Sequence, residues 1–218
     1  MDKNLNTLLK WGIENSTNPD GTADDAAPRQ QQPMDPEILK ALFGGPSEAE
    51  LMKAAMEVIT STDPEVTLES KLVAFDNFEQ LIESLDNANN LSNLSLWTPL
   101  LGLLESDHAD LRRMAAWCVG TAVQNNEPSQ ERLLALGGLP RLLAMTTSGE
   151  EDVNVRRKAV FALSSACRNY QPAMDALVAE AAKQGGGNAD KVDAANMDAV
   201  DAVMNGLRAA IPKPPAAV

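Results

Sequence analysis

The sequence predicts an all-α protein built as a solenoid of helical repeats, and two observations lead to that fold class. Apolar residues recur at three- and four-residue steps along most of the chain, which is the period of an amphipathic helix. In the second half of the chain, a helical pattern repeats every 41 to 44 residues without a strand signal. Such units bury their apolar faces by stacking on their neighbours, so the repeat predicts a solenoid.

The first 35 residues divide into a short helix and a polar linker. Residues 3–15 carry an apolar helical face, whereas residues 16–35 are rich in Asn, Pro, Gly, Gln and Asp. Burial cannot offset the entropy of ordering such a polar stretch. We therefore expect residues 1–35 to be a flexible N-terminal segment with one short helix. Its apolar side chains are Leu5, Leu8, Leu9, Trp11 and Ile13.

Two helices are then expected before residue 61. Residues 36–43 form the first helix, which the Gly-Gly-Pro sequence at 44–46 ends. Ser47 and Glu50 have the spacing of a capping box, which predicts the start of a second helix that runs to about Thr60.

A long amphipathic helix is expected from Asp63 to Asp86. Asp63 suits the N-cap position, and Pro64 suits the first helical position. The helix then meets the Asn-rich segment 86–90, which we expect to form a turn because Asn commonly ends helices. With the helix before it, this helix should cap one end of the solenoid.

The repeat is clearest between residues 112–117 and 156–161, which align at a spacing of 44 residues. Trp117 and Phe161 end these two segments and so occupy equivalent positions. Large aromatic side chains at equivalent helical positions predict buried anchors of adjacent repeats.

One repeat unit can be read completely. A helix at 129–136 ends at the glycine pair 137–138, a second helix follows at 139–146, and a third spans 153–169. This order of three helices is typical of an armadillo repeat. We therefore predict an armadillo-like helical core over residues 36–183.

The repeat pattern fails after Ala182. The Gly-rich segment 185–188 indicates a linker, and an amphipathic helix follows before Pro212. This helix either docks on the open end of the solenoid or is loosely held. Docking is favoured because an uncapped repeat would expose apolar surface. Residues 184–218 are thus predicted to be a linker plus a possible C-terminal cap.

Composition limits the classes of partner. With 31 acidic and 18 basic residues, the chain has a net charge of −13. This charge disfavours nucleic acid and anionic membranes, because both attract basic surfaces. The sequence has no apolar run of signal or membrane length. Its two isolated cysteines indicate buried thiols in a reducing compartment.

No catalytic or metal-binding motif is found in the sequence. His108 is the only histidine, and neither cysteine is near it in sequence, so a metal site is not expected. Nucleophile elbows, phosphate-binding loops and dinucleotide fingerprints are missing. We expect no cofactor and no enzymatic activity, since a hydrolase would need a site assembled from residues distant in sequence.

A binding surface is the better interpretation. In armadillo solenoids the third helix of each repeat lines a groove, where a Trp and an Asn one turn later hold an extended peptide. Here Thr121 follows Trp117, and Ser165 follows Phe161, so the Asn is missing. We therefore expect a groove that binds a folded partner. Polar residues recur near the expected helix ends, at 86–90, 124–126 and 168–170.

Four strings, at residues 8–16, 39–45, 72–90 and 121–126, carry a resemblance to a known family. In this order they resemble the Fes/HspBP family, the armadillo-type nucleotide exchange factors of the seventy-kilodalton heat-shock chaperone. The resemblance covers roughly residues 3–183.

The resemblance implies a cytoplasmic, monomeric co-chaperone whose core binds the ATPase domain of the chaperone and promotes ADP release. Residues 1–35 would help to free clients by imitating them at the substrate domain, through the five apolar side chains named above. The alternatives are an armadillo scaffold for another folded partner and, less favoured, a hydrolase. The residues expected to contact the ATPase domain are Asn77, Glu83, Asn87, Ala88, Asn89, Asn90, Gln124, Asn125, Asn126, Arg168 and Asn169.

Overall fold

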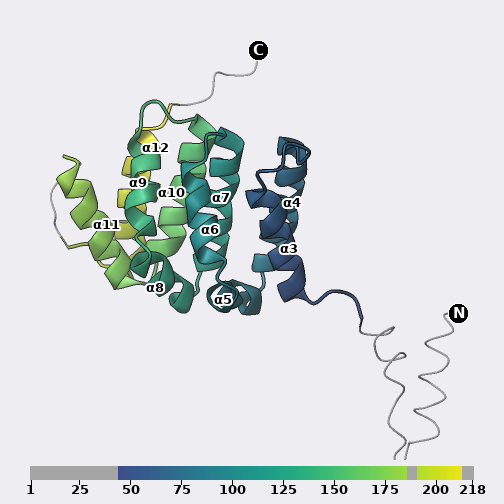
Figure 1. The fold of residues 1–218 in the computed structure, drawn as a ribbon. Coiled ribbons are helices and arrows are strands. Elements are labelled where there is room, and N and C mark those ends of the chain that lie inside the picture. The colour runs from purple at the N-terminus through teal and green to yellow at the C-terminus, as the bar shows by residue number, and fades with distance from the viewer. Residues whose placement is uncertain (1–43, 186–190, 213–218) are drawn as a thin grey trace, which may run out of the picture. The chain divides into compact units, whose positions relative to one another are not determined.

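The structure, a computed structural model, describes residues 44–185 and 191–212 (Figure 1). Within these ranges the chain forms ten α-helices and one 3₁₀-helix, and no strand. The helices expected at 3–15 and 36–43 lie outside the described residues. The elements are α3 (Glu48–Thr60), α4 (Leu68–Ile82), α5 (Leu85–Asn93), α6 (Trp97–Gly102), η1 (Leu103–Glu105), α7 (Ala109–Val123), α8 (Glu127–Ala135), α9 (Gly138–Thr147), α10 (Val153–Cys167), α11 (Gln171–Lys183) and α12 (Met197–Ala209).

From Glu48 onward the helices pack in two rows. The helices α4, α7 and α10 pack side by side in one row, and α12 continues it beyond α10 (Figure 1). The second row contains α3, α6 and α9, each packed against one member of the first row. The short helices α5 and α8 lie together at one end of both rows. This arrangement confirms the predicted armadillo-like helical-repeat fold.

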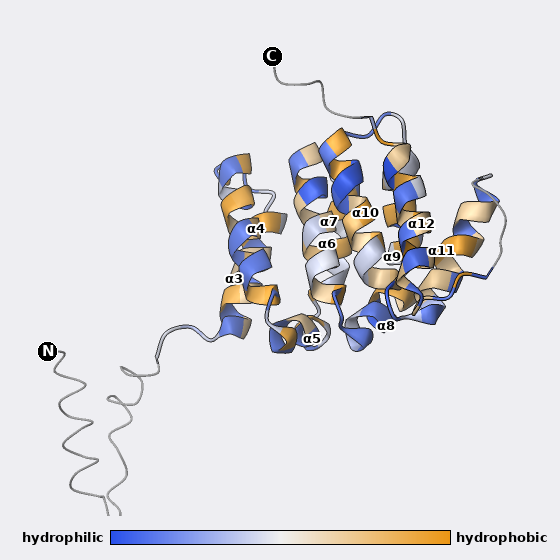
Figure 2. Ribbon diagram, turned by 180° about the vertical axis from the view of Figure 1, so that it is seen from behind, coloured by the Kyte–Doolittle hydropathy of each residue, from blue (hydrophilic) through white to orange (hydrophobic). Residues whose placement is uncertain are grey.

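A continuous apolar core runs between the two rows. The largest fully buried side chains include Phe75 and Phe78 of α4 and Trp97 of α6. Apolar and polar turns alternate along the ribbons of α4, α10 and α12, as amphipathic helices require (Figure 2). The core therefore extends across the repeats from α3 to α12.

Close packing of α7 against α10 depends on a glycine. A Cβ atom added at Gly120 would lie 2.5 Å from Cε1 of Phe161, well inside contact distance. The edge of the Phe161 ring therefore packs directly on the α7 backbone. Small side chains such as Ala116 and Ala162 are fully buried on these two helices.

The expected start of the long helix at Asp63 is wrong. The helix begins at Leu68, and Thr67 is its N-cap, with Oγ1 accepting a hydrogen bond from the Ser70 N–H at 3.1 Å. The carboxylate of Asp63 instead accepts from the Glu65 N–H at 2.9 Å within a tight turn. Two capping residues compete here, and the one nearer to the apolar run begins the helix.

The expected Asn-rich turn at 86–90 is also wrong, because these residues lie in α5. The helix α4 ends at Ile82, and Ser84 has an extended backbone that separates it from α5. The Nδ2 of Asn87 donates to the carbonyl oxygen of Leu81 at 2.9 Å and to Oε2 of Glu48 at 2.7 Å. These hydrogen bonds stabilise the junction of α4 and α5. The asparagine therefore supports a helix where the sequence predicted a turn.

The prediction that Trp117 and Phe161 are buried anchors is wrong as well. Both side chains are only partly buried. Small residues fill the contact between α7 and α10, so the aromatic rings remain at its edge. The repeat alignment itself holds, since both residues occupy the same position in consecutive helices of the row.

The C-terminal segment is packed against the last repeat. Val200 and Met204 of α12 are fully buried in the common core. The Asn169 N–H donates to the Ala194 carbonyl oxygen at 2.9 Å, which ties the segment to the turn between α10 and α11. The end of α12 is also fixed, because Nη2 of Arg156 donates to the Ala210 carbonyl oxygen at 2.9 Å.

Candidate partner-binding surface

The open face of the α4, α7 and α10 row carries a polar and aromatic pocket. The helix α4 contributes carboxylates, α7 contributes an aromatic ring and polar groups, and α10 contributes a second ring. We call this the carboxylate–aromatic pocket. Its lining residues are Glu79, Glu83, Trp117, Thr121, Gln124, Asn125 and Phe161.

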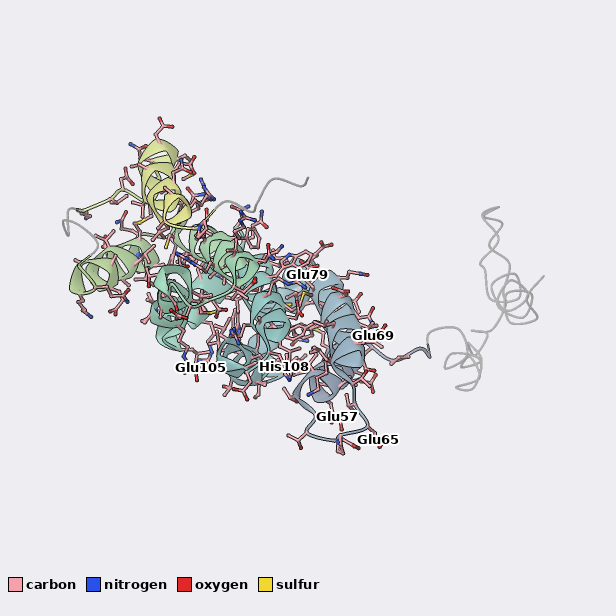
Figure 3. All side chains as sticks on the ribbon, turned by 90° about the horizontal axis from the view of Figure 1, so that it is seen from above. Glu57, Glu65, Glu69, Glu79, Glu105 and His108 are labelled. Atoms are coloured by element: carbon pink, nitrogen blue, oxygen red, sulfur yellow. The ribbon has the colours of Figure 1, made fainter. Side chains whose placement is uncertain are left out.

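A buried carboxylate joins α4 to α7 inside this pocket. Glu79 is 7% exposed, and its Oε1 accepts a hydrogen bond from Oγ1 of Thr121 at 2.8 Å. Figure 3 shows Glu79 where α4 meets α7, away from Glu57 and Glu65. Thr121 takes the position at which peptide-binding armadillo repeats carry their Asn, and here it holds a side chain of the neighbouring helix.

An ammonium group lies against the aromatic side of the pocket. The Nζ of Lys158 lies 3.4 Å from the ring centroid of Trp117 and 5.7 Å from that of Phe161. Burial lowers the pKa of Lys158, Glu79 raises it, and the nearby Arg113 lowers it further. The aromatic pair therefore already holds one cation by cation–π attraction.

Basic residues surround a second hollow next to the first. This second hollow lies between α7 and α10, and Lys158 is one of the residues that line it. The row thus changes from acidic at α4 to basic at α10. The residues that line the second hollow are Asp110, Arg113, Asn154, Arg157, Lys158 and Phe161.

Three of the residues predicted to bind a partner meet in the carboxylate–aromatic pocket. Glu83, Gln124 and Asn125 are all exposed and line it together. Asn125 has a left-handed backbone with φ of 51°, which Asn tolerates better than most residues. The turn after α7 is therefore both a helix end and part of the pocket wall.

Other predicted residues are accessible but lie elsewhere. Asn77 is exposed in an apolar hollow between α3 and α4, beside Leu51 and Val58. Asn89 is exposed on α5, and Asn90 accepts a hydrogen bond from Asn93 at 3.2 Å on the same helix. None of these three asparagines lines the carboxylate–aromatic pocket.

Asn87, Ala88 and Asn126 do not fit a role in direct partner contact. They are 6%, 3% and 3% exposed. The Nδ2 of Asn126 donates to the Ala122 carbonyl oxygen at 3.1 Å and to Oγ of Ser129 at 2.9 Å. The expectation of an exposed turn at Ala88 is corrected, because the helix α5 buries that side chain against the core.

Arg168 and Asn169 are engaged by the C-terminal segment. The guanidinium of Arg168 contacts the Asp201 carboxylate in a short ion pair and also reaches the sulfur of Met197. Asn169 is exposed, with φ of 57°, but its N–H is bonded to Ala194. Neither residue lines the carboxylate–aromatic pocket.

The client-mimic residues expected in the first 35 positions lie outside the described part of the chain. Among the residues that the structure does describe, His, Cys, Asp and Glu side chains form no group of three or more that could hold a metal ion. Within the same ranges, every helix is too short or too polar to cross a bilayer.

Sequence reasoning missed four residues that line the carboxylate–aromatic pocket, namely Glu79, Trp117, Thr121 and Phe161, and also the neighbouring Lys158. The signal was present, because the third helix of an armadillo repeat was expected to line a groove. The two rings were assigned to the core on their size and their equivalent positions in the repeat, although a partly exposed ring beside a lysine suits a binding face equally well.

These features together define a class of protein, a helical-repeat protein that acts by binding a partner. Two family models match the chain and together cover residues 5–186. Residues 5–91 match the family "Nucleotide exchange factor Fes1", and residues 87–186 match the "SIL1/FES1/HPBP1 C-terminal domain".

Named relatives agree with both family models. A protein of Gibberella zeae named Hsp70 nucleotide exchange factor FES1 is 61% identical over 97% of this chain and 99% of its own length. The Neurospora crassa protein of the same description is 55% identical over 95% of this chain and 98% of its own length. A Candida glabrata relative is 47% identical over 76% of this chain and 56% of its own length.

The chain belongs to the Fes1 family of nucleotide exchange factors. Membership confirms the family predicted from the four sequence strings and the function of nucleotide exchange. It also confirms that the chain is not an enzyme, because an exchange factor acts through binding alone.

A solved structure supports the fold independently. A crystal structure of an engineered protein superposes with a TM-score of 0.51 and covers 80% of this chain and 67% of that one. At 18% sequence identity, this likeness concerns the fold alone.

Proposed function

We propose that this chain binds the ATPase domain of Hsp70 through the open face of α4, α7 and α10 and accelerates the release of ADP. The observation that carries the proposal is the carboxylate–aromatic pocket, in which exposed polar groups of two repeats converge on a partly exposed aromatic pair. The relatives' name, Hsp70 nucleotide exchange factor, supplies the partner.

The mechanism requires no covalent chemistry. If the chain binds nucleotide-free Hsp70 more tightly than ADP-bound Hsp70, thermodynamic linkage makes it weaken ADP by the same factor. A hundredfold effect corresponds to about 2.7 kcal/mol of differential binding. A packed helical-repeat surface can supply this energy by fitting one conformation of the partner better than another.

The proposal divides the chain into three parts. Residues 36–183 form the core that binds the ATPase domain, and residues 184–218 supply the linker and the C-terminal cap. Residues 1–35 compete with clients at the substrate domain of Hsp70, where tethering to the core raises their effective concentration. The apolar residues that would do so are Leu5, Leu8, Leu9, Trp11 and Ile13.

The proposal further describes a cytoplasmic monomer. Cys118 and Cys167 are free and buried, as a reducing compartment permits. Burial raises the pKa of the Cys167 thiol to about 12 and raises the pKa of Cys118 well above its ordinary value, so both thiols resist oxidation. The net charge of −13 opposes self-association through mutual repulsion.

Stopped-flow release of a fluorescent ADP analogue from the Hsp70 ATPase domain tests this function. The protein should accelerate release by tenfold or more at saturating concentration, on the order of 1.4 kcal/mol of barrier or above. An unchanged release rate would contradict the proposal. If the chain also fails to bind the ATPase domain, the better hypothesis is that it acts as a scaffold for another folded partner.

A further inference from the structure

We propose that the carboxylate–aromatic pocket receives a cationic side chain, Lys or Arg, from the partner. This inference rests on the proposed function and specifies the chemistry of the same surface. The ligand would insert between α4 and α7, with Glu79 and Glu83 on one side and Trp117 on the other.

The exposed carboxylate of Glu83 occupies a position that does not serve the stability of α4. The C-terminal end of a helix carries partial negative charge and is stabilised by basic residues. The last turn of α4 contains no basic residue, and Glu83 is its C-cap instead. A carboxylate placed against the helix dipole, beside the carboxylate of Glu79 that is bonded to Thr121, is consistent with a role in binding.

Glu79 is also held in a fixed orientation. Its side chain is nine-tenths buried and bonded through Oε1 to Thr121, while Glu83 is exposed at the rim. A fixed carboxylate inside and an exposed one at the rim can form charge-assisted hydrogen bonds to an ammonium or guanidinium group. Preorganisation of this kind lowers the entropic cost of binding.

The aromatic walls already show affinity for a cation. The ammonium of Lys158 lies 3.4 Å from the Trp117 ring centroid, within the range of cation–π attraction. Lys158 lines the neighbouring hollow and not the pocket itself, whose α4 side is formed by Glu79 and Glu83. An incoming guanidinium can contact the same aromatic pair from there.

The surrounding charges select against other ligands. An anionic side chain would meet Glu79 and Glu83, and its desolvation would not be compensated. A cation that approached the second hollow would meet the three basic residues Arg113, Arg157 and Lys158, against a single carboxylate, Asp110, which is already paired with Arg113. The acidic-to-basic change along the row therefore directs a positive group to α4 and fixes the orientation of the partner.

Substitution of the exposed carboxylate tests the inference directly. We would measure the dissociation constant and association rate for the Hsp70 ATPase domain with Glu83→Gln and Glu83→Lys, at 50 and 300 mM salt. Glu57→Gln and Glu57→Lys are matched controls, because Glu57 is exposed on α3 and far from Glu79 (Figure 3).

The expected result is a graded loss of binding without a loss of stability. Glu83→Gln should weaken binding roughly fivefold and Glu83→Lys roughly fiftyfold, and both should reduce the salt dependence of the association rate. The melting temperature of Glu83→Gln should stay equal or rise slightly, because an unfavourable charge leaves the helix end. Both Glu57 variants should bind within twofold of the parent.

Two outcomes would overturn the inference, and a third would overturn the proposed function instead. If both Glu83 variants bind within twofold of the parent, the pocket does not receive a cation, although exchange activity stands. Tighter binding by Glu83→Lys would show that the pocket meets an anion. A parent protein that does not bind the ATPase domain would contradict the proposed function itself.

Discussion

The turns that follow α7 and α10 have the same local structure but different surroundings. Each has an asparagine with positive φ, Asn125 at 51° and Asn169 at 57°, and each leads into a helix with a proline in its first turn. Asn125 lies in the wall of an open pocket, whereas the backbone of Asn169 is bonded to Ala194.

The difference teaches that a repeat determines backbone shape, while its neighbours determine which surface remains accessible. The C-terminal segment covers the later turn, where Nε2 of Gln171 donates to the Val192 carbonyl oxygen and Oε1 of Gln171 accepts from the Ala194 N–H. Within the described residues, no comparable segment lies on the earlier turn. The binding face that we propose is thus confined to α4, α7 and the near side of α10.

The largest effect is expected at the junction of α4 and α5, which is the equivalent helix end one repeat before the turn after α7. Ala88→Arg should lower the free energy of unfolding by on the order of 3–5 kcal/mol, because it places a cation in a packed apolar site. Asn89→Arg, on the exposed side of the same helix, should change it by less than about 0.5 kcal/mol. Urea unfolding compares the two, and equal stabilities would show that the junction is open like the turn after α7.

The next largest effect is expected where α12 packs against α10 and covers the last repeat. Met204→Ala removes a fully buried side chain from α12 and should cost about 2–4 kcal/mol in the same unfolding measurement. Asn205→Ala is the control, since that side chain is exposed. If Met204→Ala unfolds at the parental urea concentration, α12 does not stabilise the α10 end of the row.

A moderate effect is expected where α7 meets α10. Gly120→Ala would bring a methyl group against the Phe161 ring and should cost about 1–3 kcal/mol. Gly102→Ala has open space around the added methyl group and should be neutral or stabilising by up to about 1 kcal/mol. Thermal unfolding of both variants checks the pair, and a neutral Gly120→Ala would contradict the close contact.

The smallest effect concerns the ion pair that helps to cover the later turn. Asp201→Asn should cost only about 0.2–1 kcal/mol, because both partners remain partly exposed to solvent. Hydrogen exchange of the Asn169 amide should nevertheless accelerate, since that amide depends on the position of the C-terminal segment. Unchanged exchange would show that the segment is held by its apolar side chains alone.

Much of the fold could be predicted from the sequence because its determinants are local. The helices at 129–136, 139–146 and 153–169 correspond to α8, α9 and α10 within a few residues, since glycine and apolar spacing define them. The error at 86–90 arose because Asn87 is satisfied by Leu81 and Glu48, and the sequence alone could not place Glu48 beside it.

The candidate site was predicted only in part for the same reason. Glu83, Gln124 and Asn125 could be proposed because helix ends are visible in the sequence. Glu79 could not, because its role depends on Thr121, a contact between residues of two different repeats. The accessibility of Arg168 could not be predicted either. Its guanidinium is paired with Asp201 of α12, which is 33 residues away in the sequence.

The most direct test of the account is hydroxyl-radical footprinting of this protein with and without the Hsp70 ATPase domain. The central claim is that the partner covers the face of α4, α7 and α10. Binding should therefore protect Trp117 and Phe161 from oxidation and leave Tyr170, beside the covered turn after α10, unchanged. Protection of Tyr170 with no change at Trp117 and Phe161 would contradict the claim.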